Sequence, residues 1–508
     1  MAPRGELHAR VSRSCGNCRA VKRRCDQQLP RCGQCIRTRE ECSGYRDEWD
    51  LVFRNQTDHT INRSRESGVK RRDKINFTRN GNTSPPRASS LSPSHDAMGV
   101  NYFVHNFVTN GQPSSRGYLN YIPAVYATQS RHCPMLMASM AAVGLITLAN
   151  TTRQPQLVKH AHAKYAEAIS QVNTALASPT ESIKDSTLMS VISLGLFEHV
   201  SDFASWARHV RGAAALVVAR GKSQFSTGAA FLMFNQVRAD LVGVCIHGGQ
   251  PFPADMCELQ EEASTHMDTM NVVWRLGVLA TQCARFLWSV MNNTGEIPWP
   301  ALLEQATGLQ GELQYIFGIL SVESGYTTTR KSGGDPAVFY NEQLGSYMNC
   351  WAIRVWNNTR ILQIKICDSI RYIFNQLLIA GLDPVSQTRM ELKLLDILEI
   401  LSTLGNDIIA TLPQALGATS SASEIDPAVG ISSPINGSAG YMMIWSLYVA
   451  GKSSAMENDP RKWIIQRLRE FGHAGGITLA LQLVEDLIKI DQCADREPLI
   501  PILGPFTR

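Results

Sequence analysis

Apolar side chains recur at steps of three and four from about residue 101 onward, the spacing that places them on one face of an α-helix. In one such segment Leu157, Ala161 and Val172 share a face, with polar residues between them. The pattern predicts helices over residues 157–176, 188–200, 206–220, 392–409 and 477–490. Strict two-residue alternation bounded by turn pairs is nearly absent, so a sheet has little support. The large region is therefore predicted to be all-α.

Two segments depart from this amphipathic pattern. Residues 134–149 are almost entirely apolar, but they are fewer than the ~20 residues that a membrane-spanning helix needs, and Ser139, Gly144 and Thr147 interrupt them. We expect a buried core helix there and no membrane partner. Residues 412–440 are rich in Pro, Gly and Ser and are predicted to form a long loop. The N-terminus is basic without an apolar run, so it is not expected to be a secretory signal.

Charge divides the 508-residue chain into unequal regions. Residues 1–100 carry 20 Lys and Arg against 11 Asp and Glu, whereas the remainder carries 29 against 33. A basic N-terminal region on a mildly acidic body favours a polyanion as the partner of the N-terminal region. Residues 46–100 are polar, with Ser-Pro pairs and few large apolar side chains, a composition typical of a disordered linker. We therefore expect a cysteine-rich domain over 1–45, a flexible basic linker over 46–100 and the helical body over 101–508.

Six of the 13 cysteines form an internal repeat with a period of 17 residues. The repeat reads Cys15-x2-Cys18-x6-Cys25 and then Cys32-x2-Cys35-x6-Cys42. Six thiolates complete two tetrahedral zinc sites only if two of them are shared, so the count favours a cluster of two metal ions with a formal charge of −2. Three alternatives fit the pattern less well. A single four-cysteine zinc site would leave two cysteines over, and disulfides are rare in intracellular proteins. A CxxC redox motif is expected within a βαβ unit, which is absent here.

The two halves of this repeat differ in charge between the second and third cysteines. Residues 19–24 hold four cations and no anion, while residues 36–41 are neutral overall. We expect the first segment, as a short helix, to face nucleic-acid phosphates. The residues assigned mainly to phosphates are Arg19, Arg23 and Arg24, with Arg31, Arg10 and Arg13 as weaker candidates. The alternative is that these cations only balance the charge of the cluster.

The stretch CGNCRAVKRRCDQQLPRCGQCIRTREEC resembles the fungal zinc binuclear cluster DNA-binding domain at every cysteine. The resemblance implies two Zn²⁺ ions bridged by Cys15 and Cys32, and a turn between the halves set by Pro30. It also implies a first helix that enters the major groove and reads a CGG-type triplet. Lys22 matches the lysine that donates to guanine, whose O6 and N7 atoms accept such bonds. Val21 departs from the basic residue often found beside that lysine.

A second resemblance lies in the helical body. The segment Trp206-Ala-Arg-His-Val-Arg-Gly212, closing with Arg220-Gly221, is similar to a signature of the fungal-specific transcription factor domain. This implies a large helical regulatory region over about residues 100–500. We expect Trp206 and Val210 to face the core and Gly212 to permit a close helix approach.

These observations predict a zinc-dependent, sequence-specific DNA-binding regulator of RNA polymerase II genes in the nucleus, with the transcription machinery as a further partner. No GxxxxGK[ST], HExxH, GxGxxG or GxSxG motif is present, so an enzyme is not expected. The basic residues 70–74 suit nuclear import or further phosphate contacts. No three-heptad pattern occurs in 46–100, which leaves a homodimer open only through the body. The alternative function is a zinc cluster that binds protein or RNA.

Overall fold

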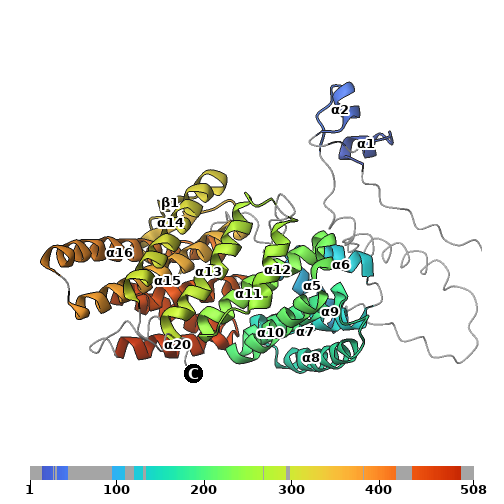
Figure 1. Cartoon of the computed structure of the whole chain (residues 1–508). Coiled ribbons are helices and arrows are strands. Elements are labelled where there is room, and N and C mark those ends of the chain that lie inside the picture. Colours follow the sequence, from blue (N-terminus) through green and yellow to red (C-terminus); the bar gives the residue numbers. More distant parts are fainter. Residues whose placement is uncertain are drawn as a thin grey trace, which may run out of the picture. The chain divides into compact units, whose positions relative to one another are not determined.

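The computed structural model describes residues 14–43 (apart from 27, 29 and 30), 94–108, 119–129, 133–266, 268–292, 298–381, 383–418 and 437–492. These residues fall into two compact units, a small N-terminal unit and a large body (Figure 1). Regular structure in the described residues is almost entirely helical, which confirms the mainly α fold. The predicted linker lies largely outside the described residues, although helix α5 begins at His95, before the expected start of the body.

The N-terminal unit contains two short helices, α1 (Gly16–Ala20) and α2 (Gly33–Arg37). The α-helices of the body are α5 (His95–Phe107), α6 (Ile122–Gln129), α7 (Pro134–Thr152), α8 (Pro155–Leu176), α9 (Asp185–Ser201), α10 (Phe203–Arg220), α11 (Gly228–Gly248), α12 (Ala254–Ser264), α13 (Val272–Asn292), α14 (Trp299–Ser324), α15 (Cys350–Ala380), α16 (Pro384–Ala410), α17 (Leu412–Ala415), α18 (Gly437–Lys452), α19 (Asn458–His473) and α20 (Thr478–Gln492). Two 3-10 helices, η1 (Lys222–Ser226) and η2 (Tyr340–Glu342), and two strands, β1 (Thr327–Arg330) and β2 (Gln343–Ser346), complete the described elements.

All five helices predicted from apolar spacing are present, as α8, α9, α10, α16 and α20. Local capping fixes the ends of α10. The carboxylate of Asp202 accepts hydrogen bonds from the backbone N–H groups of Ala204 and Ser205, which have no partner within the helix. At the other end, Gly221 takes a φ of +63°, a conformation that favours glycine, and stops the helix.

Helix α7 lies at the centre of its neighbours and packs against α5, α8 and α9. It crosses α5 where Gly144 meets Gly99, so closely that a Cβ on Gly144 would collide with the carbonyl of Gly99. By length and composition α7 and α11 are apolar enough to cross a membrane, but 72% and 50% of the qualifying windows are buried inside the fold. The prediction of a buried helix over 134–149 is confirmed.

The remaining helices continue this packing across the body. Helix α11 packs against α9, α10 and α13, and α13 in turn contacts α14 and α15. Helix α15 also packs against α16 and α18, and α18 contacts α19 and α20. In Figure 1, α11–α13 therefore lie between the group α7–α10 and the group α14–α16.

Two predictions about the body need correction. An antiparallel β-hairpin was not expected, yet β1 and β2 pair with Thr327 opposite Ser346 and Arg330 opposite Gln343. Every residue of β1 is exposed, so no alternation of apolar positions marks the strand in the sequence. The loop predicted over 412–440 is shorter than expected, because α17 follows Thr411 directly and α18 begins at Gly437.

The signature segment in α10 meets two of its three expectations. Trp206 and Val210 are buried, as predicted. Gly212, in contrast, is exposed, and no atom lies within 4 Å of the place where a Cβ would stand. The close helix approach expected at Gly212 is therefore wrong for the described residues.

Candidate metal centre and nucleic-acid interface

The 17-residue sequence repeat of the N-terminal unit is also a repeat of backbone structure. Helices α1 and α2 begin immediately after Cys15 and Cys32, and each of these thiols accepts a hydrogen bond from the N–H of the second cysteine of its pair. Each helix is followed by a residue with positive φ, 51° at Lys22 and 53° at Arg39. The two halves thus adopt the same local conformation.

The helix of the first half is placed differently from our prediction. We expected it to follow the CxxC pair over residues 19–24, but α1 already contains Cys18 and ends at Ala20. Lys22 lies beyond the helix in the left-handed turn, which is closed by the N–H of Arg23 donating to the carbonyl of Cys18 at 2.9 Å. The turn directs the chain toward Cys25 after only one helical turn and a half.

The cysteine sulfur atoms converge with the spacing of a metal site. The Sγ atom of Cys32 lies 3.6 Å from those of Cys15 and Cys18, and the Sγ atoms of Cys15 and Cys35 are 3.7 Å apart. Around a tetrahedral zinc ion with Zn–S bonds of about 2.3 Å, neighbouring sulfurs are ~3.8 Å apart. These four cysteines are fully buried, and Cys25 and Cys42 pack against them. The donor set therefore fits zinc.

Metal binding at these thiols requires the release of protons. The N–H of Cys18 lowers the pKa of the Cys15 thiol, but burial and hydrogen bonds with neighbouring thiols outweigh it and leave this pKa well above its usual value. At Cys32 the N–H of Cys35 acts in the same lowering direction, and burial with the thiol contacts still raises the pKa to about 12. Because zinc binds thiolates, the cation must displace these protons.

Arg23 contacts the cluster that the cysteines form. Its Nε lies 3.4 Å from the Sγ of Cys18, its Nη2 lies 3.6 Å from the Sγ of Cys35, and the same guanidinium forms an ion pair with Glu40. The hydrogen bond that Arg23 donates to Glu40, followed by the one it donates to Cys18, holds the pKa of Arg23 above its usual range. Arg23 thus places positive charge beside sulfurs from both halves.

The other predicted basic residues are placed differently. Lys22, Arg24 and Arg31 are exposed, and none of them takes part in an ion pair within the described residues. The backbone of Arg19 belongs to α1, but the structure does not describe its side chain. Pro30, Arg10, Arg13 and residues 70–74 lie outside the described residues.

Two contacts that the sequence did not reveal join each half to the helix of the other. The carboxylate of Asp26 accepts a hydrogen bond from the N–H of Gly33 at 2.9 Å, at the start of α2. The hydroxyl of Ser43 donates to the side-chain oxygen of Asn17 in α1 at 2.8 Å. Asp26 and Ser43 are 17 residues apart and each follows the third cysteine of its half, so the repeat is the signal that could have paired them.

Comparison with known families matches both units. The model described as "Fungal Zn(2)-Cys(6) binuclear cluster domain" matches residues 13–50 and includes all six clustered cysteines. The model described as "Fungal specific transcription factor domain" matches residues 100–317 and includes the Trp206 segment. Comparison with curated proteins and with solved structures gives no match.

Proposed function

We propose that this chain, which is a fungal Zn2Cys6 transcription factor, reads CGG-type half-sites in nuclear DNA and regulates RNA polymerase II genes. The chain is a DNA-binding transcription regulator, and its six clustered cysteines hold two zinc ions. The observation that carries the proposal is the contrast between the halves. In the first half Lys22 and Arg24 are exposed and form no ion pair among the described residues. Residues 36–41 of the second half are neutral overall, and Glu40 there pairs with Arg23 of the first half. Both matched families are transcription factor domains and not enzymes.

Lys22 is the residue we assign to base recognition. It lies in the turn between Cys18 and Cys25, so ligands of the cluster fix the backbone on both sides. Its exposed ammonium group can donate to O6 and N7 of guanine in the major groove. A rigid turn with a long side chain suits readout of a short sequence, because only a few base edges lie within its reach.

Phosphate contacts position this turn on the duplex. We assign Arg24 and Arg31, which are exposed, and Arg19 to phosphate oxygens. Arg23 adds to the positive field, but its hydrogen bonds to Cys18 and Cys35 support a structural role at the cluster in place of the phosphate contact we expected.

Cys15 and Cys32 are the thiols we propose as bridges between the two ions. The Sγ of Cys15 contacts the sulfurs of both Cys32 and Cys35, and the Sγ of Cys32 contacts those of both Cys15 and Cys18. These contacts are to the opposite half, and the Sγ atoms of all four cysteines lie within 4.8 Å of one another. Each of the two thiols therefore has sulfur neighbours in both halves, as a shared ligand requires. Homodimers and contacts with the transcription machinery also belong to this proposal.

Fluorescence anisotropy with the full-length, zinc-loaded protein tests the function. We expect a CGG-containing duplex to bind at least ~10³-fold more tightly than a scrambled duplex at physiological salt, as specific sites do. The Lys22→Ala variant should lose about 1–3 kcal/mol of this preference. Arg39→Ala, at the equivalent turn of the second half, should keep it. Equal affinity for CGG duplex, scrambled duplex and RNA would instead favour a cluster that binds RNA or protein.

A further inference from the structure

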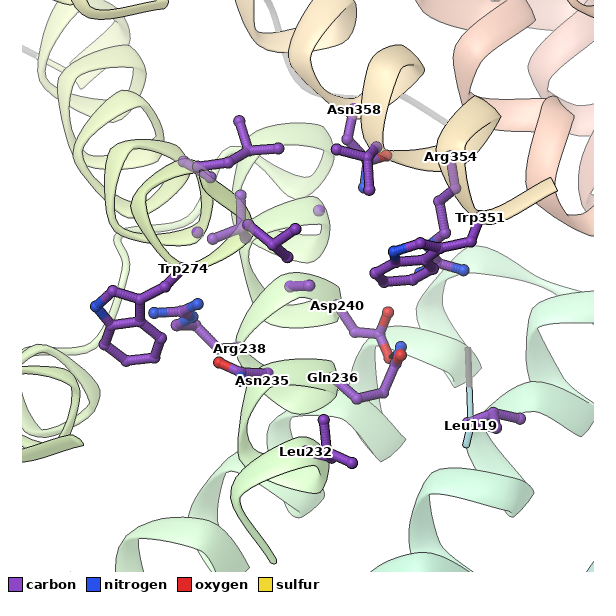
Figure 2. A pocket seen from close by; sticks show the side chains of 18 of the residues that line it. Leu119, Leu232, Asn235, Gln236, Arg238, Asp240, Trp274, Trp351, Arg354 and Asn358 are labelled. Carbon is purple, nitrogen blue, oxygen red and sulfur yellow. Dashed lines mark hydrogen bonds between the residues drawn. The ribbon is translucent and has the colours of Figure 1, made fainter. Parts of the chain in front are cut away.

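The body contains a cavity of about 530 Å³ whose walls come mainly from α11, α13 and α15. This volume lies within the range of sites that hold small organic molecules. Figure 2 shows Trp274 of α13 and Trp351 of α15 on opposite sides of polar side chains from α11. Further aromatic rings, among them Trp445 and Phe231, complete the lining. Walls of this kind suit a flat, apolar body.

The charge in the lining is predominantly positive. Arg238 and Arg354 both line the cavity, and Asp240 is the only carboxylate among its described lining residues. Asp240 accepts a hydrogen bond from the Gln236 amide at 2.7 Å. Burial raises the pKa of Asp240 to about 6, although the charge of Arg354 and the bond from Gln236 act in the opposite direction. One carboxylate thus faces two guanidinium groups. The arginines therefore leave an excess of positive charge.

Arg238 is a buried cation that forms no ion pair within the described residues. Its side chain is only 4% exposed, its guanidinium lies over the ring of Trp274 at 4.3 Å, and its Nη1 donates to Gln260 at 3.0 Å. The Nε atom has no hydrogen-bond partner. Burial lowers the pKa of Arg238 to about 9, which still leaves it charged at neutral pH. Buried cations ordinarily have an anion beside them.

Hydrogen-bond donors without partners also outnumber acceptors in the lining. The indole Nε1 of Trp351 has no hydrogen-bond partner, and Nδ1 of His199 has no hydrogen-bond partner either. The indole of Trp445 donates to Nε2 of His199 at 2.9 Å, and burial lowers the pKa of this neutral histidine to about 3. Its proton is therefore on Nδ1, which makes that atom a donor. The side-chain oxygen of Asn235 is an acceptor without a partner in the described lining.

We propose that this cavity binds a planar organic anion, an aromatic carboxylate, with its ring against the aromatic lining and its charge compensated by Arg238 and Arg354. Aromatic walls select the flat apolar body, and the excess of cations and donors selects the acidic group. The site is separate from the zinc cluster, so its occupancy does not depend on the DNA-binding proposal.

Binding of 2-naphthoate to the full-length protein, followed by calorimetry and by quenching of tryptophan fluorescence, tests the proposal. The neutral isostere 2-naphthalenemethanol provides the comparison for charge. We expect the carboxylate to bind at least ~10-fold more tightly than the alcohol, because a charge-assisted hydrogen bond is about twice as strong as a neutral one. Arg354→Gln and Arg238→Gln should each remove most of this difference, and Arg354→Lys should retain part of it.

Two further variants make the result decisive. Arg285→Gln removes an exposed arginine of α13 that does not line the cavity, and it should leave the preference unchanged. Ala239→Trp adds bulk at an exposed lining position with both arginines intact, and it should weaken binding of both probes at least ~10-fold. Equal affinity for acid and alcohol, or naphthoate binding that survives Ala239→Trp, would overturn the proposal even where an arginine variant fails to fold.

Discussion

Arg23 and Glu40 occupy equivalent positions in the two halves of the N-terminal unit, 17 residues apart, and their side chains form an ion pair. The repeat has thus kept its backbone while placing opposite charges at matching positions. Because Arg23 also donates to the sulfurs of Cys18 and Cys35, this pair connects both halves to the cluster. The negative charge of Glu40 is therefore neutralised by Arg23 within the N-terminal unit.

Substitution of Arg23 should loosen the metal centre. Residues that hydrogen-bond to metal ligands tune metal affinity, and their loss costs about 10–100-fold. We expect Arg23→Gln to lower zinc affinity by about tenfold in competition with a chromogenic chelator, and Glu40→Gln to have a smaller effect because it leaves the sulfur contacts in place. Arg37→Gln, an exposed residue of α2, is the control. Equal zinc affinity in Arg23→Gln and the parent would contradict this role.

Removal of zinc should abolish DNA binding and spare the body. Structural zinc in small finger peptides contributes about 10–16 kcal/mol, and about 30 residues cannot bury enough apolar surface without it. The six clustered cysteines all lie outside the body. We expect excess chelator to remove zinc, measured by elemental analysis, and to abolish duplex binding while helical circular dichroism largely persists. Readdition of zinc should restore binding. Sequence-specific binding by protein shown to be zinc-free is the contrary result.

Lys22 and Arg24 should affect DNA binding in different ways. Lys22→Ala removes a base contact, so about 1–3 kcal/mol of discrimination between CGG and altered triplets should be lost. Arg24→Gln removes a phosphate contact, so affinity should fall for every sequence and the slope of log K against log salt should decrease by about one. Titrations at several salt concentrations measure both quantities. If Arg24→Gln changes sequence preference and not the salt slope, the assignment of the two residues is reversed.

Gly212 and Trp206 should respond oppositely to substitution by alanine. No atom would contact a Cβ at Gly212, and alanine is favoured over glycine within a helix, so Gly212→Ala should stabilise the body by about 1 kcal/mol. Trp206 is 5% exposed and packs against the rings of Phe203 and Trp445, so Trp206→Ala should cost about 3–5 kcal/mol. Urea denaturation of the full chain measures both changes. A destabilised Gly212→Ala variant would show that this face packs against another surface.

Lys365 should make the stability of the body depend on pH. It is 4% exposed, and burial, with Lys452 nearby, lowers its pKa to about 7 against the opposing effect of Asp368 and Asp486. Between about pH 7 and pH 10.5 the unfolded chain therefore binds more protons at this group than the folded chain does. The free energy of unfolding should rise with pH through that window, by at most about 1.4 kcal/mol per pH unit from this group.

The variant Lys365→Met should lack this contribution. Urea denaturation at pH 7, 8 and 9 gives the free energy of unfolding of both proteins, and the difference between them isolates Lys365 from other titrating groups. We expect Lys365→Met to be more stable than the parent at pH 7 and the advantage to shrink as the pH rises. An advantage that stays constant with pH would contradict the effect of burial on this lysine.

Local patterns predicted those parts of the fold that depend on near neighbours in the sequence. Apolar spacing located α8 and α10 because one helix face is buried against the core in each. Apolar spacing did not locate α15, where Arg360 is fully buried although arginine is typical of a surface position. Besides the nearby Asn357, its partners are Tyr347 at 2.8 Å and Asp407 at 3.3 Å. These two lie 13 and 47 residues away, so a local window does not contain both.

The functional residues show the same division. Spacing alone identified the six cysteines, because a shared metal centre constrains how far apart its ligands lie in sequence. Charge alone grouped Arg23 with Lys22, and only the structure shows that Arg23 contacts sulfur while Lys22 faces solvent. The cavity could not be predicted, although Trp351 and Arg354 are three residues apart and share a helix face, because Trp274 comes from a distant helix.

The matched turns after α1 and α2 separate the constant part of this unit from its variable part. Both halves share one backbone conformation and the same ion-ligand spacing, whereas their exteriors differ in charge: one is cationic, and the other carries Glu40 and Glu41. The exterior of one half can therefore be mutated to select new partners while the inorganic core that keeps the unit folded is retained.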